Sequence, residues 1–245
     1  MNVSVIDNPY LIPFDDTYIL YDARDPISFI SAYFSLLPVG VLVFYLSWFI
    51  TTREMEACII AGGQVANEIF NNIIKNIIKQ PRPYSFGETF QNGTMRSGYG
   101  MPSAHSQFMG FFFVYTSLRF ALRWKGLNQV KRMAGIITMG TLAFMVCFSR
   151  VYLKYHTLEQ VLVGFSIGLV SGSSYFFIVG ILREIGILEW VLQLGICKML
   201  YMKDSCNLAP ITLKEEYEMY LARVEPIANK SKSDVKDKTK MNKNQ

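Results

Sequence analysis

Long uncharged stretches, separated by short polar connections, make up most of this chain. The first covers residues 27–50, which contain no charged residue and include Pro38. A helix needs about 20 apolar residues to cross a hydrocarbon layer about 30 Å thick, and such a span tolerates one proline. We therefore expect a membrane-spanning helix here, and three more at 104–124, 133–153 and 157–182.

Two further segments are apolar but carry charges. Residues 54–74 hold three glutamates, so they predict a span only if their polar face turns into a helical bundle. Residues 185–202 are shorter and include Glu189 and Lys198, a pattern typical of a helix at the membrane interface. The expected fold class is an all-α, polytopic membrane helical bundle with four or five transmembrane helices and one interfacial helix. A composition of 51% hydrophobic and 18% charged residues agrees with this.

The chain divides by composition into four parts. Residues 1–26 form an acidic amino-terminal segment with five aspartates and one arginine, without the basic start and cleavage site of a signal peptide. A membrane-embedded domain at 27–182 and an interfacial and cytosolic segment at 183–228 follow. Residues 229–245 hold six lysines and two aspartates, which predicts a solvated, disordered tail. Most of the net charge of +5 comes from this tail, so no nucleic-acid partner is expected.

Lysine and arginine are divided unequally between the two sides of the membrane. With five spans, one side receives seven of the 24, from 1–26, 75–103 and 150–156, and the other side receives 17. Because cytoplasmic loops collect Lys and Arg, we expect 75–103 to face the lumen and the carboxyl-terminal tail to face the cytosol. A glycosylation sequon at Asn92 falls on the lumenal side in this prediction.

The chain contains two histidines, and each lies at the predicted boundary of a span. The sequence Pro-Ser-Ala-His ends at His105, and His156 follows Arg150 by six positions. A third cluster places Arg82 seven positions after Lys75. Since successive spans run in opposite directions, all three clusters fall on one face of the membrane and can converge on one pocket.

The residue types in these clusters suit phosphoryl transfer. Arginine holds phosphate oxygens through a planar fork of donors and lysine adds a compact charge, while Ser103 and the N–H groups of a helix beginning near 104 add donors. Fixed cations of this kind replace Mg²⁺ in stabilising a transferring phosphoryl group. One histidine can then attack phosphorus while the other protonates the departing oxygen. Neither has a His or Cys companion at metal-ligand spacing, so no metal and no cofactor is expected.

The three clusters resemble the signature of the type 2 phosphatidic acid phosphatase superfamily of metal-independent phosphatases, over about residues 55–182. The resemblance implies a helical bundle of that kind, His156 as nucleophile, His105 as general acid, and phosphate binding by Lys75, Arg82, Ser103 and Arg150. The sequences of residues 99–115 and 149–164 are similar to those of the dolichyldiphosphatase branch. That branch implies dolichyl diphosphate as substrate, a lumenal site in the endoplasmic reticulum membrane, recycling of the carrier lipid for protein N-glycosylation, and no obligatory protein partner.

Two positions depart from the general superfamily pattern. Ala104 replaces a glycine between serine and histidine, and Gln160 replaces the aspartate four residues after the nucleophile. A helical spacing of four puts His156 and Gln160 on one face. A glutamine oxygen can orient the imidazole but supplies no negative charge, and Glu159 could substitute only if the helix start were distorted. The dolichyl branch also carries glutamine here, so we interpret Gln160 as a nucleophile-orienting branch marker.

Three alternatives remain open from the sequence. The first is a phosphatase for another lipid phosphate, such as phosphatidate, diacylglycerol pyrophosphate or a sphingoid-base phosphate, because nothing in the residues measures the lipid groove. The second is a catalytically silent membrane homologue, supported only by Gln160. A metal-dependent hydrolase is less favoured than either.

Overall fold

The computed structural model describes residues 19–83, 99–124, 126–208 and 214–226. The sequon at Asn92 and the lysine-rich tail lie outside the described residues. The chain divides into two compact units, of which the larger ends at Asn207 and the smaller begins at Leu208. In the smaller unit, the described part is a helix over 214–226.

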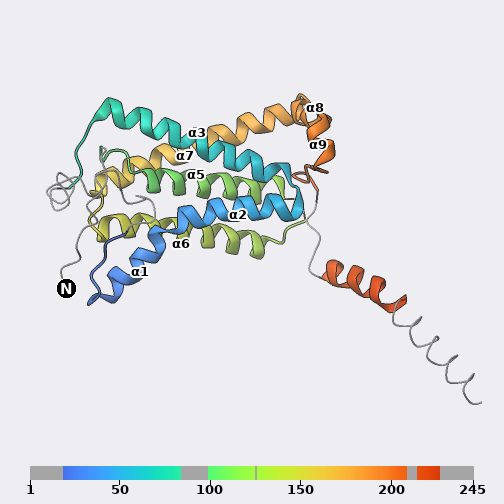
Figure 1. Ribbon diagram of the computed structural model, residues 1–245, viewed down its shortest axis with the longest axis horizontal. Coiled ribbons are helices and arrows are strands. Elements are labelled where there is room, and N and C mark those ends of the chain that lie inside the picture. Colours follow the sequence, from blue (N-terminus) through green and yellow to red (C-terminus); the bar gives the residue numbers. More distant parts are fainter. Residues whose placement is uncertain (1–18, 84–98, 125, 209–213, 227–245) are drawn as a thin grey trace, which may run out of the picture. The chain divides into compact units, whose positions relative to one another are not determined.

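The larger unit is helical, and its elements match the apolar segments of the sequence closely (Figure 1). They are α1 (Pro26–Ser35), α2 (Leu37–Thr52), α3 (Met55–Ile78), α5 (Ala104–Leu118), the π-helix η1 (Arg119–Arg123), α6 (Gln129–Tyr152), α7 (Leu158–Glu184), α8 (Ile187–Leu192) and α9 (Gly195–Met199). The segments 26–52, 129–152 and 158–184 are long and apolar enough to cross a membrane. The predicted all-α membrane bundle is therefore confirmed.

Pro38 marks the start of a helix within the first predicted span. The helix α1 ends at Ser35 and α2 begins at Leu37, so the proline lies in the first turn of α2. A proline is tolerated there because the first N–H groups of a helix have no partner inside the helix. The proline thus divides one apolar segment into two helices.

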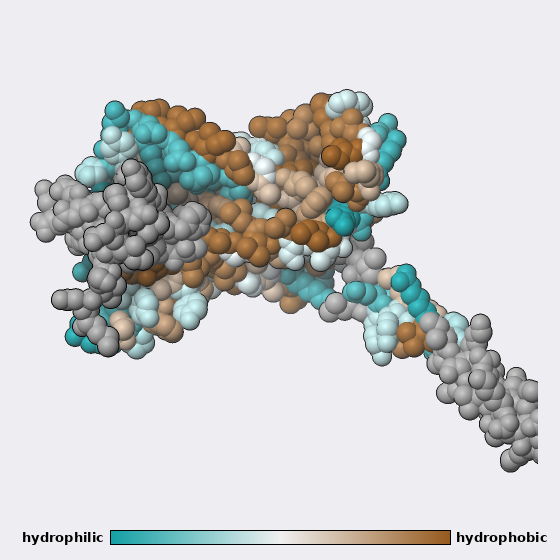
Figure 2. Space-filling view, viewed as in Figure 1, coloured by the Kyte–Doolittle hydropathy of each residue, from teal (hydrophilic) through white to brown (hydrophobic). Residues whose placement is uncertain are grey.

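The helix α3 turns its polar side inward and its apolar side outward. Gln64, Asn67 and Asn71 are buried, whereas Val65 and Ile69 expose more than half of their surface. With 24 residues α3 is about 36 Å long, enough to cross a bilayer. Figure 2 shows hydrophobic side chains covering much of the visible face of the bundle. The condition that the sequence set for a span at 54–74 is met by Glu54 and Glu56, which are buried, but not by Glu68, which is exposed.

Glycines bring α5 and α7 into close contact. A Cβ atom added to Gly168 would lie 2.2 Å from the Gln107 carbonyl oxygen, and one added to Gly110 would lie 2.4 Å from that of Phe165. Real Cβ atoms do not approach an oxygen so closely, so only glycine fits. Small residues let membrane helices approach one another in this way, and the contact fixes the start of α5 against α7.

Two short helices, α8 and α9, stand in place of the single interfacial helix expected at 185–202. Gly186 has a φ of 81°, and this left-handed conformation ends α7 and turns the chain. After α9 the chain returns to the start of α3, where the Met55 N–H donates to the Lys203 carbonyl oxygen at 2.8 Å. We call this end of the bundle, which carries Glu56, Arg119, Arg183 and Asp204, the opposite end, because the two histidines lie at the other end of the helices.

Candidate active site

The predicted site residues gather where four chain segments meet at the other end of the bundle, called here the catalytic end. Lys75 lies in the last turn of α3 and Arg150 in the last turn of α6. His105 lies in the first turn of α5, and His156 lies just before α7. The antiparallel course of the helices therefore brings together the clusters that the sequence separates by up to 81 positions.

Gln160 holds the imidazole of His156. Its Oε1 lies 3.1 Å from His156 Nδ1 and accepts from the Thr157 N–H at 3.3 Å. Its Nε2 donates to the Pro81 carbonyl oxygen at 2.9 Å and to Gln80 Oε1 at 3.2 Å. These partners fix which end of the amide is oxygen, so His156 Nδ1 must be the donor. The other ring nitrogen, Nε2, then carries the lone pair that a nucleophile needs.

The surroundings of His156 keep it neutral. The residue is 4% exposed and lies between α6 and α7, outside both helices. Burial lowers the pKa of His156 well below its ordinary value, the positive charges of Arg150, Arg82 and Lys75 lower it further, and the Gln160 hydrogen bond opposes them. An unprotonated imidazole is the form that attacks phosphorus. All three predicted cations therefore lie close enough to His156 to act on it.

Arg150 is fixed by two residues that the sequence did not reveal. Its guanidinium donates to Ser35 Oγ at 3.0 Å and lies over the Tyr155 ring, with Cζ 4.2 Å from the ring centroid. The side chain is 1% exposed. Nothing in the sequence marks the Ser35 hydroxyl at the end of α1 as a partner of Arg150. Tyr155 could be suspected only because it precedes His156 in the sequence. Both contacts orient the planar fork of Arg150.

Ser103 and the start of α5 are held against α7. The Ser103 N–H donates to the Gln160 carbonyl oxygen at 3.1 Å, and Ser103 Oγ accepts from Ser106 Oγ at 3.0 Å. Ser103 is the residue that precedes the first turn of α5, where N–H groups favour an anion. The structure thus places Ser103 and this helix start beside Gln160, which contacts His156.

Buried amides of α3 and α5 hold the start of α5 against α3. Asn71 Nδ2 donates to the Pro102 carbonyl oxygen at 3.4 Å and to Gln107 Oε1 at 2.8 Å. Gln107 Nε2 in turn donates to Asn67 Oδ1 at 2.9 Å. All three amide side chains are at most 5% exposed. Their polar character could be read from the sequence, but their pairing depends on how α3 and α5 meet.

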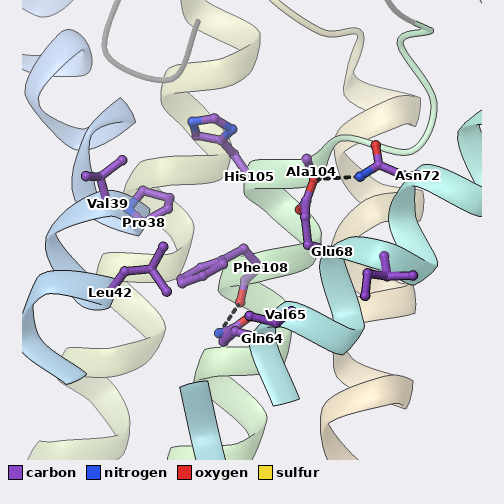
Figure 3. A pocket seen from close by; sticks show the side chains of 11 residues that line it. Pro38, Val39, Leu42, Gln64, Val65, Glu68, Asn72, Ala104, His105 and Phe108 are labelled. Atoms are coloured by element: carbon purple, nitrogen blue, oxygen red, sulfur yellow. Dashed lines mark hydrogen bonds between the residues drawn. The ribbon is translucent and has the colours of Figure 1, made fainter. Parts of the chain in front are cut away.

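An apolar groove leads from His105 along α2 and α3 (Figure 3). Pro38, Val39 and Leu42 line one side, and Phe108 lies below His105. The polar residues Gln64, Glu68 and Asn72 line the side formed by α3, together with Val65 and Ile69. A groove with apolar walls and a histidine at its head suits a ligand with a lipid tail and a phosphate.

Glu159 does not occupy the place of an orienting carboxylate. It is exposed in the first turn of α7, whereas Gln160 is 1% exposed and faces His156. Thr157 and Gln160 form a capping box, in which each side chain accepts from the backbone N–H of the other. The helix start is therefore regular, and the distortion that would bring Glu159 to His156 is absent from these described residues.

Comparisons with known proteins point to one family. Residues 56–182 match the PAP2 superfamily. A dolichyldiphosphatase from Saccharomyces cerevisiae is 64% identical over 221 residues, which cover 90% of this chain and 92% of the yeast protein. Dolichyldiphosphatase 1 of Homo sapiens is 39% identical over 166 residues, or 65% of this chain and 68% of the human protein. Among solved structures, a PAP2-type phosphatidylglycerolphosphate phosphatase from Bacillus subtilis is 24% identical, with a TM-score of 0.48, over 66% of this chain and 79% of its own.

Proposed function

The chain belongs to the PAP2 superfamily, and on this premise we propose that it is an enzyme that hydrolyses dolichyl diphosphate to dolichyl phosphate and inorganic phosphate. The high identity with a yeast protein named dolichyldiphosphatase supports this substrate. The reaction needs no metal, because Lys75, Arg82 and Arg150 supply fixed positive charge to the phosphoryl group.

The observation that carries the proposal is that a cationic surrounding at His156 and a largely apolar groove at His105 lie at the same end of the bundle. His156 lies among cations with Nδ1 held by Gln160, while His105 lines an apolar groove. The general acid protonates the leaving group, and the leaving group of a lipid diphosphate carries the tail. A lipid tail in the groove therefore places its terminal phosphate toward His156 and its departing oxygen toward His105.

The chemistry follows in two steps. His156 Nε2 attacks the terminal phosphorus, a P–N bond forms, and the bond to the bridging oxygen breaks. The departing lipid phosphate keeps the electron pair and takes a proton from His105. Water then gives a proton to His105 and attacks the phosphohistidine, which breaks the P–N bond and releases inorganic phosphate.

The setting of the reaction forms part of the proposal. The enzyme is a multi-pass protein of the endoplasmic reticulum membrane, with the catalytic end in the lumen, the carboxyl-terminal tail in the cytosol, and the product re-used as carrier lipid for protein N-glycosylation. The unequal division of Lys and Arg supports this orientation. A glycan on Asn92 in microsomes would support a lumenal catalytic end, and accessibility of that segment to a cytosolic reagent in sealed microsomes would contradict it.

The test compares phosphate release from dolichyl diphosphate, dolichyl phosphate, phosphatidate and sphingosine phosphate by purified protein in one detergent, with a chelator present. We expect dolichyl diphosphate to have the highest kcat/KM. His156→Ala should lower its turnover at least about a thousandfold, whereas Glu159→Ala, a matched exposed neighbour, should change it less than about threefold. Faster turnover of phosphatidate would overturn the substrate, and full activity of His156→Ala would overturn the nucleophile.

A further inference from the structure

Gln160 contacts all three clusters of the site at once. Its side chain reaches His156 and the segment that precedes Arg82, through Gln80 and Pro81. Its main-chain carbonyl oxygen accepts from the Ser103 N–H. Gly100 leaves room for this side chain, since a Cβ atom there would lie 2.7 Å from Gln160 Nε2. The site is built around an amide at this position.

A carboxylate would not make the same contacts. The Pro81 carbonyl oxygen and Gln80 Oε1 accept hydrogen bonds from Gln160 Nε2, and a carboxylate has no N–H to donate. The Pro81 carbonyl oxygen can only accept, so it would repel a carboxylate oxygen in the place of Gln160 Nε2, whereas Gln80 could turn its own amide to donate. The packing around Gln160 therefore selects a neutral orienting group for His156.

This neutrality affects the step in which His156 gains charge. As the P–N bond forms, the imidazole becomes positive, and among the described residues the charged side chains that act on it, Arg150, Arg82 and Lys75, are positive as well. A carboxylate on Nδ1 would stabilise that charge, as the aspartate of a catalytic triad does. An amide stabilises it less. The site is consequently suited to a transition state in which little positive charge has developed on the imidazole.

The leaving group decides how much charge develops. A phosphate monoester leaving from a diphosphate has a second pKa of about 6, whereas an alcohol leaving from a phosphate ester has a far higher pKa, close to that of water. A good leaving group departs early, when bonding to the nucleophile has hardly begun, and transfer of a phosphoryl group is loose in most analyses. A poor leaving group requires more bonding to His156 and more charge on it.

We propose that Gln160 is a positioning residue that makes this site selective for phosphoanhydrides over phosphate esters, so that the enzyme removes one phosphate from a lipid diphosphate and leaves the remaining monophosphate intact. The inference rests on the proposed function and names the bond class of its substrate. It also explains how the product escapes a second hydrolysis although it keeps the same tail and fits the same groove.

The experiment measures the ratio of kcat/KM for dolichyl diphosphate to that for dolichyl phosphate in wild type and four variants. Gln160→Glu adds charge at the same length, while Gln160→Asp and Gln160→Asn form a short pair that differs only in charge. Within one preparation the ratio does not depend on the fraction of folded protein. We expect a wild-type ratio above about a hundredfold. It should fall at least about tenfold from Asn to Asp and from Gln to Glu, while Glu159→Gln, the exposed neighbour, leaves it unchanged.

The outcomes separate this inference from the proposed function. Equal ratios in the Asp and Asn variants, and in Glu and wild type, would overturn the role of Gln160 while the substrate stands. If wild type preferred monophosphate esters, both proposals would fail. Should the charged variants not fold, wild-type turnover of aryl phosphates with rising leaving-group pKa replaces them. A steep fall in rate supports the inference, and a flat dependence contradicts it.

Discussion

Buried charges of opposite sign meet one another at the opposite end of the bundle, whereas the described charges that act on His156 at the catalytic end share one sign. At the opposite end Glu56, which is 1% exposed, forms ion pairs with Arg119 and Arg183. Arg183 also donates to Asp204 at 2.8 Å, and Tyr115 donates to Glu56 at 2.9 Å. Every member of this cluster has a partner of complementary chemistry.

At the catalytic end three positive charges act on His156, and the neutral amide of Gln160 forms a hydrogen bond with its imidazole. Positive charges near an imidazole oppose its protonation, because like charges repel in a medium of low dielectric constant. A bound phosphate group would bring negative charge to the same place. One end of the bundle thus pairs charges of opposite sign, whereas the described charges that act on His156 at the other end suit an anionic ligand.

The largest expected effect separates the two ends through stability. Glu56→Gln removes the charge that pairs Arg119 and Arg183 and should lower the free energy of unfolding by about 3–5 kcal/mol, because it leaves buried cations without compensation. Thermal unfolding in detergent measures this change, and kcat per folded molecule should stay within about twofold. Glu218→Gln, in an exposed pair with Lys214, serves as the control and should change stability by less than about 1 kcal/mol. Equal stability of both variants would show that the ion pairs of Glu56 do not stabilise the opposite end.

The next effect is the reverse, a loss of activity without loss of stability. Arg150→Gln should lower kcat/KM by about a hundredfold to a thousandfold, since a donor to the developing charge on phosphorus is lost. Its melting temperature should change less than that of Arg183→Gln, because the Arg183 side chain pairs with Glu56 and Asp204. Arg183→Gln is the matched arginine at the opposite end, and we expect it to lower the melting temperature with little change in kcat. An unstable Arg150→Gln protein would indicate a structural role for Arg150.

A smaller effect tests the affinity of the catalytic end for anions. Inorganic phosphate or vanadate should raise the melting temperature of the wild type, with a stabilisation of about 2.7 kcal/mol at a concentration of 100 times Kd. The shift should be absent in Arg150→Gln and preserved in Arg183→Gln. Sulfate-free buffer at constant ionic strength excludes general screening. Equal shifts in both variants would show that the anion does not bind at the catalytic end.

The sequence predicts the helices and the site residues better than it predicts their support. The apolar segments gave helix boundaries within a few residues at 27–50 and 157–182, because long hydrophobic runs leave few alternatives in a membrane. The convergence of Lys75, His105 and His156 followed from the alternating direction of spans. The hydrogen bonds of Arg150 to Ser35 and of Gln160 to Pro81 could not be predicted, since they join residues 115 and 79 positions apart. They depend on how helices rotate and approach one another.

The smallest expected effect is on the pH dependence of turnover, which tests whether the cations at the catalytic end act on His156. Only the neutral form of His156 attacks phosphorus, so kcat/KM falls on the acid side as the imidazole of the free enzyme becomes protonated. Burial and then the charges of Arg150, Arg82 and Lys75 lower the pKa of His156 well below its ordinary value of 6.5. The acid limb should therefore have its midpoint below pH 6.5, and activity should be retained at pH values where an exposed histidine is already charged.

Removing one cation should move this limb in a defined direction. In Arg150→Gln the neighbouring positive charge is lost, protonation of His156 becomes easier, and the midpoint should rise by about one pH unit, which corresponds to about 1.4 kcal/mol. Arg183→Gln, with the same loss of charge at the opposite end, should leave the midpoint unchanged. Profiles of kcat/KM between pH 4 and pH 8 in one detergent measure both variants. A midpoint that moves equally in the two variants would mean that His156 responds to the net charge of the protein, and the distinction between the two ends would then fail.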